Sequence, residues 1–81
     1  MRVQVRLFAS LREAARTDAC WVTLHANAQG EDIKRVLADR LPRLSGLLES
    51  TRLARNLDYV SWDIPVHDGD ELSLIPPVSG G

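Results

Sequence analysis

The carboxyl-terminal residues are the ones whose types could do chemistry, because the chain ends in Gly80 and Gly81 after Pro76-Pro77-Val78-Ser79. Glycine lacks a Cβ atom, so two in succession can pass through a channel too narrow for side chains. Proline withholds a backbone donor and favours an extended chain, so Pro76 should end the strand before it. Residues 76–81 then reach about 20 Å at ~3.3 Å per residue. We therefore predict a flexible arm that carries the Gly81 carboxylate into the active site of another protein.

Such an arm needs a fixed base, because two terminal glycines on their own are more often a frayed end. Residues 71–75 alternate between polar and apolar side chains, with Leu72 and Leu74 on one face, which predicts a half-buried strand. Asp68, Gly69 and Asp70 before it are typical turn formers rather than a catalytic carboxylate pair. A turn followed by a core strand would fix the position at which the carboxyl-terminal arm begins.

Length and charge exclude several classes of protein. The 81 residues allow one domain, near the lower size limit for a core without disulfides or metals. A formal net charge of −1 gives no electrostatic case for binding nucleic acid or an anionic membrane. The single cysteine, Cys20, excludes an internal disulfide, and no apolar run approaches the ~20 residues that span a bilayer. No signal peptide is recognisable, so we expect a cytoplasmic protein.

Alternation of polar and apolar residues predicts about five short strands, at residues 2–8, 20–25, 52–56, 59–63 and 71–75. The simplest arrangement pairs the first two strands antiparallel. The same alternation points three aromatic side chains away from the core: Phe8, Trp21 and Trp62. Outward aromatic residues indicate a binding surface only where they cluster.

One main helix is expected to cover the sheet, with short helices beside it. Ser10 followed by Glu13 matches a capping box, in which both side chains accept backbone amides, so a short helix should follow Ser10. Asn27 is the expected cap of the main helix, and Pro42 should stop it. The apolar residues of this helix recur at helical spacing: Ile33, Val36, Leu37 and Leu41. Strands and helices in this mixture predict an α+β domain.

Short motifs along the whole chain resemble the small subunit of molybdopterin synthase. In chain order they are Leu7-Phe8-Ala9, Leu11-Arg12-Glu13, Ala54-Arg55-Asn56, Asp68-Gly69-Asp70-Glu71 and Pro76-Pro77-Val78-Ser79-Gly80-Gly81. The terminal motif is the most specific, whereas the Gly-Asp-Glu turn is shared with other carriers of that fold. Two residues depart from the family's pattern: Arg55 stands where many members carry an aliphatic residue, and Ile75 stands where some have an aromatic residue.

The resemblance implies a ubiquitin-like β-grasp fold, with a mixed sheet of about five strands packed on one main helix and short extra helices in residues 1–75. It also implies a sulfur carrier that binds no cofactor and is not an enzyme by itself. An adenylating enzyme would use ATP to activate the Gly81 carboxylate, and sulfur would replace the AMP. The thiocarboxylate would then enter the large synthase subunit and sulfurate a cyclic pterin precursor to a dithiolene. Activation is needed because an α-carboxylate, with a pKa near ~3.5, is ionised at neutral pH and resists nucleophiles.

Site residues of two kinds follow from the resemblance. The tail residues Pro76, Pro77, Val78, Ser79 and Gly80 should thread the partners' active sites, and Gly81 should carry the reacting atom. The partner interface is expected on the outer face of the sheet, at Phe8, Arg12, Tyr59 and Ile75. Binding energy must come from this surface, because the tail offers few contacts of its own.

No nucleophile, base and acid form a recognisable set elsewhere in the sequence. Cys20 lies at an inward strand position, so we expect a buried small hydrophobe rather than the sulfur donor. His25 and His67 lack metal-ligand spacing, so we expect surface histidines and no metal site.

Three other functions remain open from the sequence. A carrier that feeds thiamine or tRNA thiolation shares the fold, although such relatives usually lack the Pro-Pro step. A protein modifier would form isopeptide bonds through Gly81, and Lys34 is the only side chain available for self-linked chains. A pure interaction module would carry an incidental Gly-Gly end, and removing Gly81 would then leave the phenotype unchanged.

Overall fold

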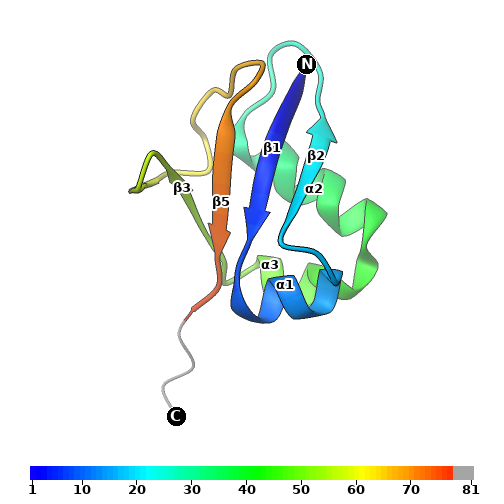
Figure 1. Ribbon diagram of the computed structural model, residues 1–81. Coiled ribbons are helices and arrows are strands. Elements are labelled where there is room, and N and C mark those ends of the chain that lie inside the picture. The colour runs from blue at the N-terminus through cyan, green and yellow to red at the C-terminus, as the bar shows by residue number, and fades with distance from the viewer. Residues whose placement is uncertain (78–81) are drawn as a thin grey trace.

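A computed structural model describes residues 1–77 and shows one mixed sheet with the main helix packed across one of its faces (Figure 1). The elements are β1 (Arg2–Leu7), α1 (Ala9–Ala15), β2 (Ala19–Thr23), α2 (Gly30–Arg40), the 3₁₀ helix η1 (Pro42–Leu44), α3 (Ser45–Leu48), β3 (Arg52–Arg55), β4 (Asp58–Val60) and β5 (Glu71–Ile75). The strand order is β2-β1-β5-β3-β4. β1 and β5 are parallel, and the other neighbours are antiparallel. The predicted α+β class and the antiparallel pairing of β1 with β2 are confirmed.

The core lies between the sheet and α2. Its largest fully buried side chains are Leu7, Leu11, Ile33, Leu37, Leu44, Leu53, Leu72, Leu74, Val3, Val5 and Val22. Burial of each such side chain contributes about 1.5–3 kcal/mol to folding. The alternate residues of the central strands, Arg2, Arg6 and Glu71, are exposed on the face that α2 does not cover. The predicted inward and outward faces of β1 and β5 are therefore confirmed.

The first helix begins before the predicted capping box. α1 starts at Ala9 with Phe8 as its N-cap, and no side chain caps it. The Phe8 carbonyl accepts two amides of the first turn, at 3.0 and 3.3 Å, so the turn closes without Ser10. Ala9 has a positive φ of 49°, which turns the chain sharply out of β1. The predicted capping box at Ser10 and Glu13 is wrong because this turn places Ser10 inside the helix.

The main helix begins after its predicted cap. Gln29, not Asn27, is the N-cap, and its amide donates to Asp32 Oδ2 at 2.8 Å within a reciprocal capping box. Close packing fixes this start, because a Cβ atom on Gly30 would lie 2.9 Å from the carbonyl oxygen of Trp62. Only glycine fits there without a shift of its neighbours, so the prediction of Asn27 as the cap is wrong.

The segment after β4 turns toward α2 instead of continuing along the sheet. β4 ends at Val60, earlier than the predicted strand over residues 59–63. Trp62 packs beside the core, with Lys34 Nζ 4.4 Å from the centroid of its ring. The predicted outward position of Trp62 is therefore wrong. No helix within residues 1–77 is long and apolar enough to cross a membrane.

Candidate functional site

The described part of the tail leaves the sheet where the sequence predicted. β5 ends at Ile75, after which Pro76 is buried and Pro77 is exposed. A groove at this point is lined by Ile75, both prolines, Phe8 and residues of α1. The remaining predicted tail residues, Val78, Ser79, Gly80 and Gly81, lie outside the described residues. The flexible arm and its reacting carboxylate therefore stay predictions.

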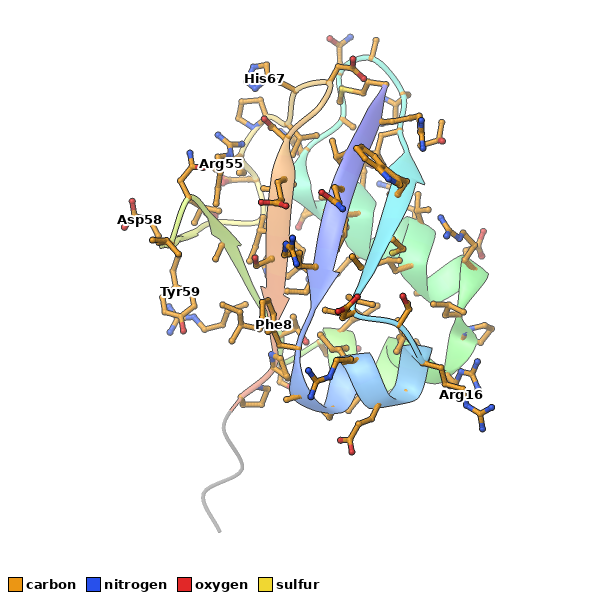
Figure 2. The ribbon with its side chains drawn as sticks, viewed as in Figure 1. Phe8, Arg16, Arg55, Asp58, Tyr59 and His67 are labelled. Atoms are coloured by element: carbon orange, nitrogen blue, oxygen red, sulfur yellow. The ribbon has the colours of Figure 1, made fainter. Side chains whose placement is uncertain are left out.

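Three of the four predicted interface residues lie at the tail end of the outer sheet face. Phe8 is 42% exposed and Tyr59 is 56% exposed, while Ile75 is partly buried at the end of β5. Figure 2 shows Phe8 beside the start of the tail and Tyr59 in the adjacent hairpin, both toward the tail end of the sheet. Arg12 differs, because it lies exposed in the last turn of α1, where a cation complements the helix carboxyl end.

The strand register shows why Tyr59 belongs to this outer face. Tyr59 pairs with Ala54, Ala54 pairs with Ser73, and Ser73 pairs with Arg6. Directly paired residues present their side chains on the same face of a sheet. Ala54 is only 6% exposed although it is not part of the core cluster. Its neighbours on the outer face therefore cover it, and they form a packed surface rather than a row of separate side chains.

A tight turn near Asn56 to Asp58 is expected from the sequence, and the β3–β4 hairpin confirms it, but its backbone angles are not indicated by the sequence. Its two tip residues, Asn56 and Leu57, have positive φ angles of 52° and 71°. Two positive angles in a two-residue loop are typical of a type I′ turn, which asparagine tolerates and leucine does not favour. Leu57 is also fully exposed, and it lines a groove on the outer face together with Phe8. The two residues between the strands predicted at 52–56 and 59–63 indicated a tight turn, but they did not indicate the positive φ angle of Leu57.

Arg55 and the acidic turn before β5 hold the opposite end of the molecule. Arg55 Nη2 donates to the Pro65 carbonyl at 2.7 Å and lies 3.8 Å from Asp70 Oδ2. Asp70 also accepts the amide of His67, and Asp68 accepts the amide of the first β1 residue, each at 2.8 Å. The aspartates are turn formers, as predicted. The unusual arginine at position 55 supports a loop, and Figure 2 shows it far from the start of the tail.

Comparison with known proteins places the chain in a family. Residues 5–81 match the profile of the ThiS family. The molybdopterin synthase sulfur carrier subunit of Escherichia coli (strain K12) is 37% identical over 81 residues, covering 98% of this chain and 99% of the relative. The chain belongs to the molybdopterin synthase sulfur carrier family. The resemblance seen in the short motifs is thereby confirmed.

Solved structures agree with the β-grasp fold of this sulfur carrier family. SAMP1, a small archaeal modifier protein from Haloferax volcanii, aligns with a TM-score of 0.87 and 29% identity, covering 100% of both chains. In a complex of subunits 1 and 2 of the molybdopterin-converting factor from Helicobacter pylori 26695, one chain aligns with a TM-score of 0.70 and 28% identity, again over 100% of both. The predicted ubiquitin-like β-grasp fold is confirmed.

The thiol of this sulfur carrier family member is poorly placed for sulfur chemistry. Cys20 lies in the edge strand β2 and packs against the core without being fully buried. Burial raises the pKa of the Cys20 thiol above its usual value, and Arg40 opposes this more weakly. A raised pKa leaves the thiol protonated at neutral pH, and a protonated thiol is a weak nucleophile.

Both histidines of the carrier lie on the surface and next to aspartates. His25 Nε2 is 3.5 Å from Asp32 Oδ2, and His67 Nδ1 is 3.8 Å from Asp70 Oδ2. Within residues 1–77, no group of three or more His, Cys, Asp or Glu side chains could hold a metal ion. Among the described residues, the features that could serve sulfur transfer are thus the start of the tail at Ile75 to Pro77 and the outer sheet face beside it.

Proposed function

We propose that this chain carries sulfur on the Gly81 carboxyl group for molybdenum cofactor biosynthesis. The observation that carries the proposal is the full-length similarity to a sulfur carrier subunit, combined with a tail rooted on an inner strand. β5 lies between β1 and β3 and is hydrogen-bonded to both, so the base of the tail is fixed on two sides. A fixed base lets the surface beside it position the arm when a partner docks.

The carrier contributes one reacting group to the cycle. The adenylating partner joins the Gly81 carboxylate to the α-phosphate of ATP and releases pyrophosphate. A sulfur nucleophile then displaces AMP and leaves a thiocarboxylate at Gly81. In the large subunit the thiocarboxylate gives its sulfur to the pterin precursor, and water restores the carboxylate. We place these steps in the cytoplasm. The carrier supplies no catalytic side chain to them, so we infer that it is not an enzyme by itself.

The large subunit is proposed to dock on the outer sheet face. This face is left open by α2, and the tail leaves from its lower end (Figure 1). Phe8 and Tyr59 provide exposed aromatic surface there, and buried aromatic residues commonly dominate binding energy at interfaces. The similar chain from Helicobacter pylori was solved as a complex with subunit 2, which supports this kind of partner.

The test of sulfur transfer follows the mass of the intact protein. After incubation with the adenylating partner, ATP and a sulfur source, mass spectrometry should show one oxygen replaced by sulfur. A variant that lacks Gly81 should gain no sulfur, while its circular dichroism spectrum stays unchanged because the last strand ends at Ile75. If this truncated protein still supports dithiolene formation, the assignment of Gly81 is wrong.

A second function, attachment to other proteins through Gly81, is favoured by the TM-score of 0.87 to an archaeal modifier. Self-linked chains are disfavoured, because the only lysine, Lys34, has its Nζ 4.4 Å from the ring centroid of Trp62. A carrier for thiamine or tRNA thiolation would use the same terminus. Addition of a cell extract to the adenylation mixture separates these functions: covalent conjugates identify a modifier, and the sulfurated pterin or other thiolated product identifies the carrier.

A further inference from the structure

Two arginines of the outer sheet face lie over aromatic rings. The guanidinium carbon of Arg52 is 4.1 Å from the ring centroid of Tyr59, and that of Arg2 is 4.7 Å from the ring centroid of Trp21. Within residues 1–77, neither guanidinium donates a hydrogen bond or forms an ion pair, in contrast to four other arginines. Both therefore keep unused donors on an exposed face.

The Arg52–Tyr59 and Arg2–Trp21 contacts lie toward opposite ends of the sheet. Arg52 is paired in register with Ile75, the last strand residue before the tail. Arg2 is the first residue of β1 and is paired with Thr23. Because β1 and β5 run parallel, Arg2 lies where both strands begin and Arg52 lies where the tail leaves. In Figure 1 the start of β1 and the arrowhead of β5 mark these two ends.

A guanidinium group that is stacked on an aromatic ring is preorganised to bind a carboxylate. The stacking already restricts the side chain, so less conformational freedom is lost when a partner binds. The planar set of N–H donors matches both oxygens of a carboxylate, which an ammonium group does not. ATP phosphates are a poor candidate, because they react at the Gly81 carboxylate, about 20 Å beyond Ile75 in an extended arm.

We propose that Arg52, held in place by Tyr59, is a specificity residue that binds an aspartate or glutamate of the large synthase subunit beside the entrance for the tail. This inference rests on the proposed docking of that subunit. Arg6 on the same face is already paired with Glu71, with Nε 3.1 Å from Oε2, so its charge is partly satisfied within the chain. Within the described part of the chain, Arg52, next to Ile75, is therefore still free to form an ion pair with a carboxylate of the partner.

Titration calorimetry of the full chain with the large subunit of the same organism tests the proposal. Loss of hydrogen bonds to a charged group should weaken binding of Arg52→Gln about tenfold to hundredfold. Arg52→Lys should recover little of this loss, because it keeps the charge without the paired donors. Arg2→Gln removes the same charge from the same face, and its affinity should stay within about twofold of wild type, because Arg2 lies at the opposite end of the sheet and its exposed charge is screened from a partner at the tail end.

Each outcome has a defined meaning. Wild-type affinity in Arg52→Gln, or an equal loss in Arg2→Gln, would overturn the inference. Thermal unfolding shows whether each variant is folded. If Arg52→Gln does not fold, Arg52→Lys decides instead, and wild-type affinity in that variant would overturn the inference. A folded wild-type chain that does not bind the large subunit refutes the proposed function itself, whereas wild-type binding with an unaffected Arg52→Gln variant refutes only the role of Arg52.

Discussion

Replacement of Leu57 by glycine should make the protein more stable. Leu57 has a φ of 71° in a two-residue turn, and its side chain is fully exposed. A left-handed backbone costs a residue with a Cβ atom about 1–2 kcal/mol, a cost that glycine avoids. Glycine loses about 0.5–1 kcal/mol through the greater freedom of the unfolded chain. Since no burial is lost, the free energy of unfolding should rise by about 0.5–1 kcal/mol.

Urea unfolding followed by circular dichroism measures this change. In a domain of this size, a gain of about 0.5–1 kcal/mol corresponds to a Tm increase of roughly 2–8 °C. Leu57→Ala is the matched control, because it keeps the Cβ atom and the strain but removes the exposed apolar group. Its free energy of unfolding should stay within about 0.5 kcal/mol of wild type. A glycine variant no more stable than the alanine variant would refute the reasoning.

The same substitution links backbone strain to function. Strained backbone angles persist chiefly where the surrounding structure or a function requires them, and they cluster at binding sites. Leu57 lines the outer-face groove together with Phe8, so docking of the large subunit would cover it. Leu57→Gly should therefore unfold at a higher temperature and bind the large subunit more weakly. Unchanged binding would place the hairpin tip outside the interface.

Two further predictions concern single titratable groups. Cys20 should be alkylated more slowly at neutral pH in the folded protein than in urea, because burial raises its thiol pKa; equal rates would contradict this. The pKa of Asp32 is lowered, chiefly by the hydrogen bond from the Gln29 amide. Its charge therefore stabilises the fold fully above the unfolded pKa of about 3.9, and this stabilisation is lost as the pH falls through the lower folded pKa. Urea unfolding at falling pH should show a smaller loss for Asp32→Asn than for wild type; parallel losses would mean that Asp32 does not cause the acid sensitivity.

The strands were predictable from the sequence because their two faces meet different surroundings. Val3 and Val5 enter the core, whereas Arg2 and Arg6 meet solvent, and this difference appears directly as alternation. The helix starts were not predictable in the same way. Each depends on a backbone contact, such as that between Gly30 and the Trp62 carbonyl, which are 32 positions apart in the sequence. Local capping patterns carry no information about such contacts.

In the candidate site, too, some features could be predicted from the sequence and others could not. The sequence motifs led to Phe8, Tyr59 and Ile75, and the structure places these residues at one end of one face. The stacking of Arg52 on Tyr59 could not be predicted, because it depends on the register between β3 and β4 and on the direction of the Arg52 side chain. The φ angle of Leu57 was also hidden, since the sequence has no glycine at the turn position that would normally indicate it.

Parallel pairing of β1 with β5 has a consequence for how substitutions should act. It places the beginnings of both strands at one end of the sheet, where Asp68 and Arg55 hold the loops, and the tail at the other end. The residues that hold these loops, such as Asp68 and Arg55, can be altered without approaching the tail end of the sheet or the reacting carboxylate, whereas Leu57 at the nearby hairpin tip belongs to the outer-face groove. Substitutions of the loop-holding residues should change the amount of folded carrier, whereas substitutions at Arg52 or Ile75 should change what each folded carrier can bind. Stability and partner recognition are therefore separated along the length of β5, and the tail belongs to the end that recognises the partner.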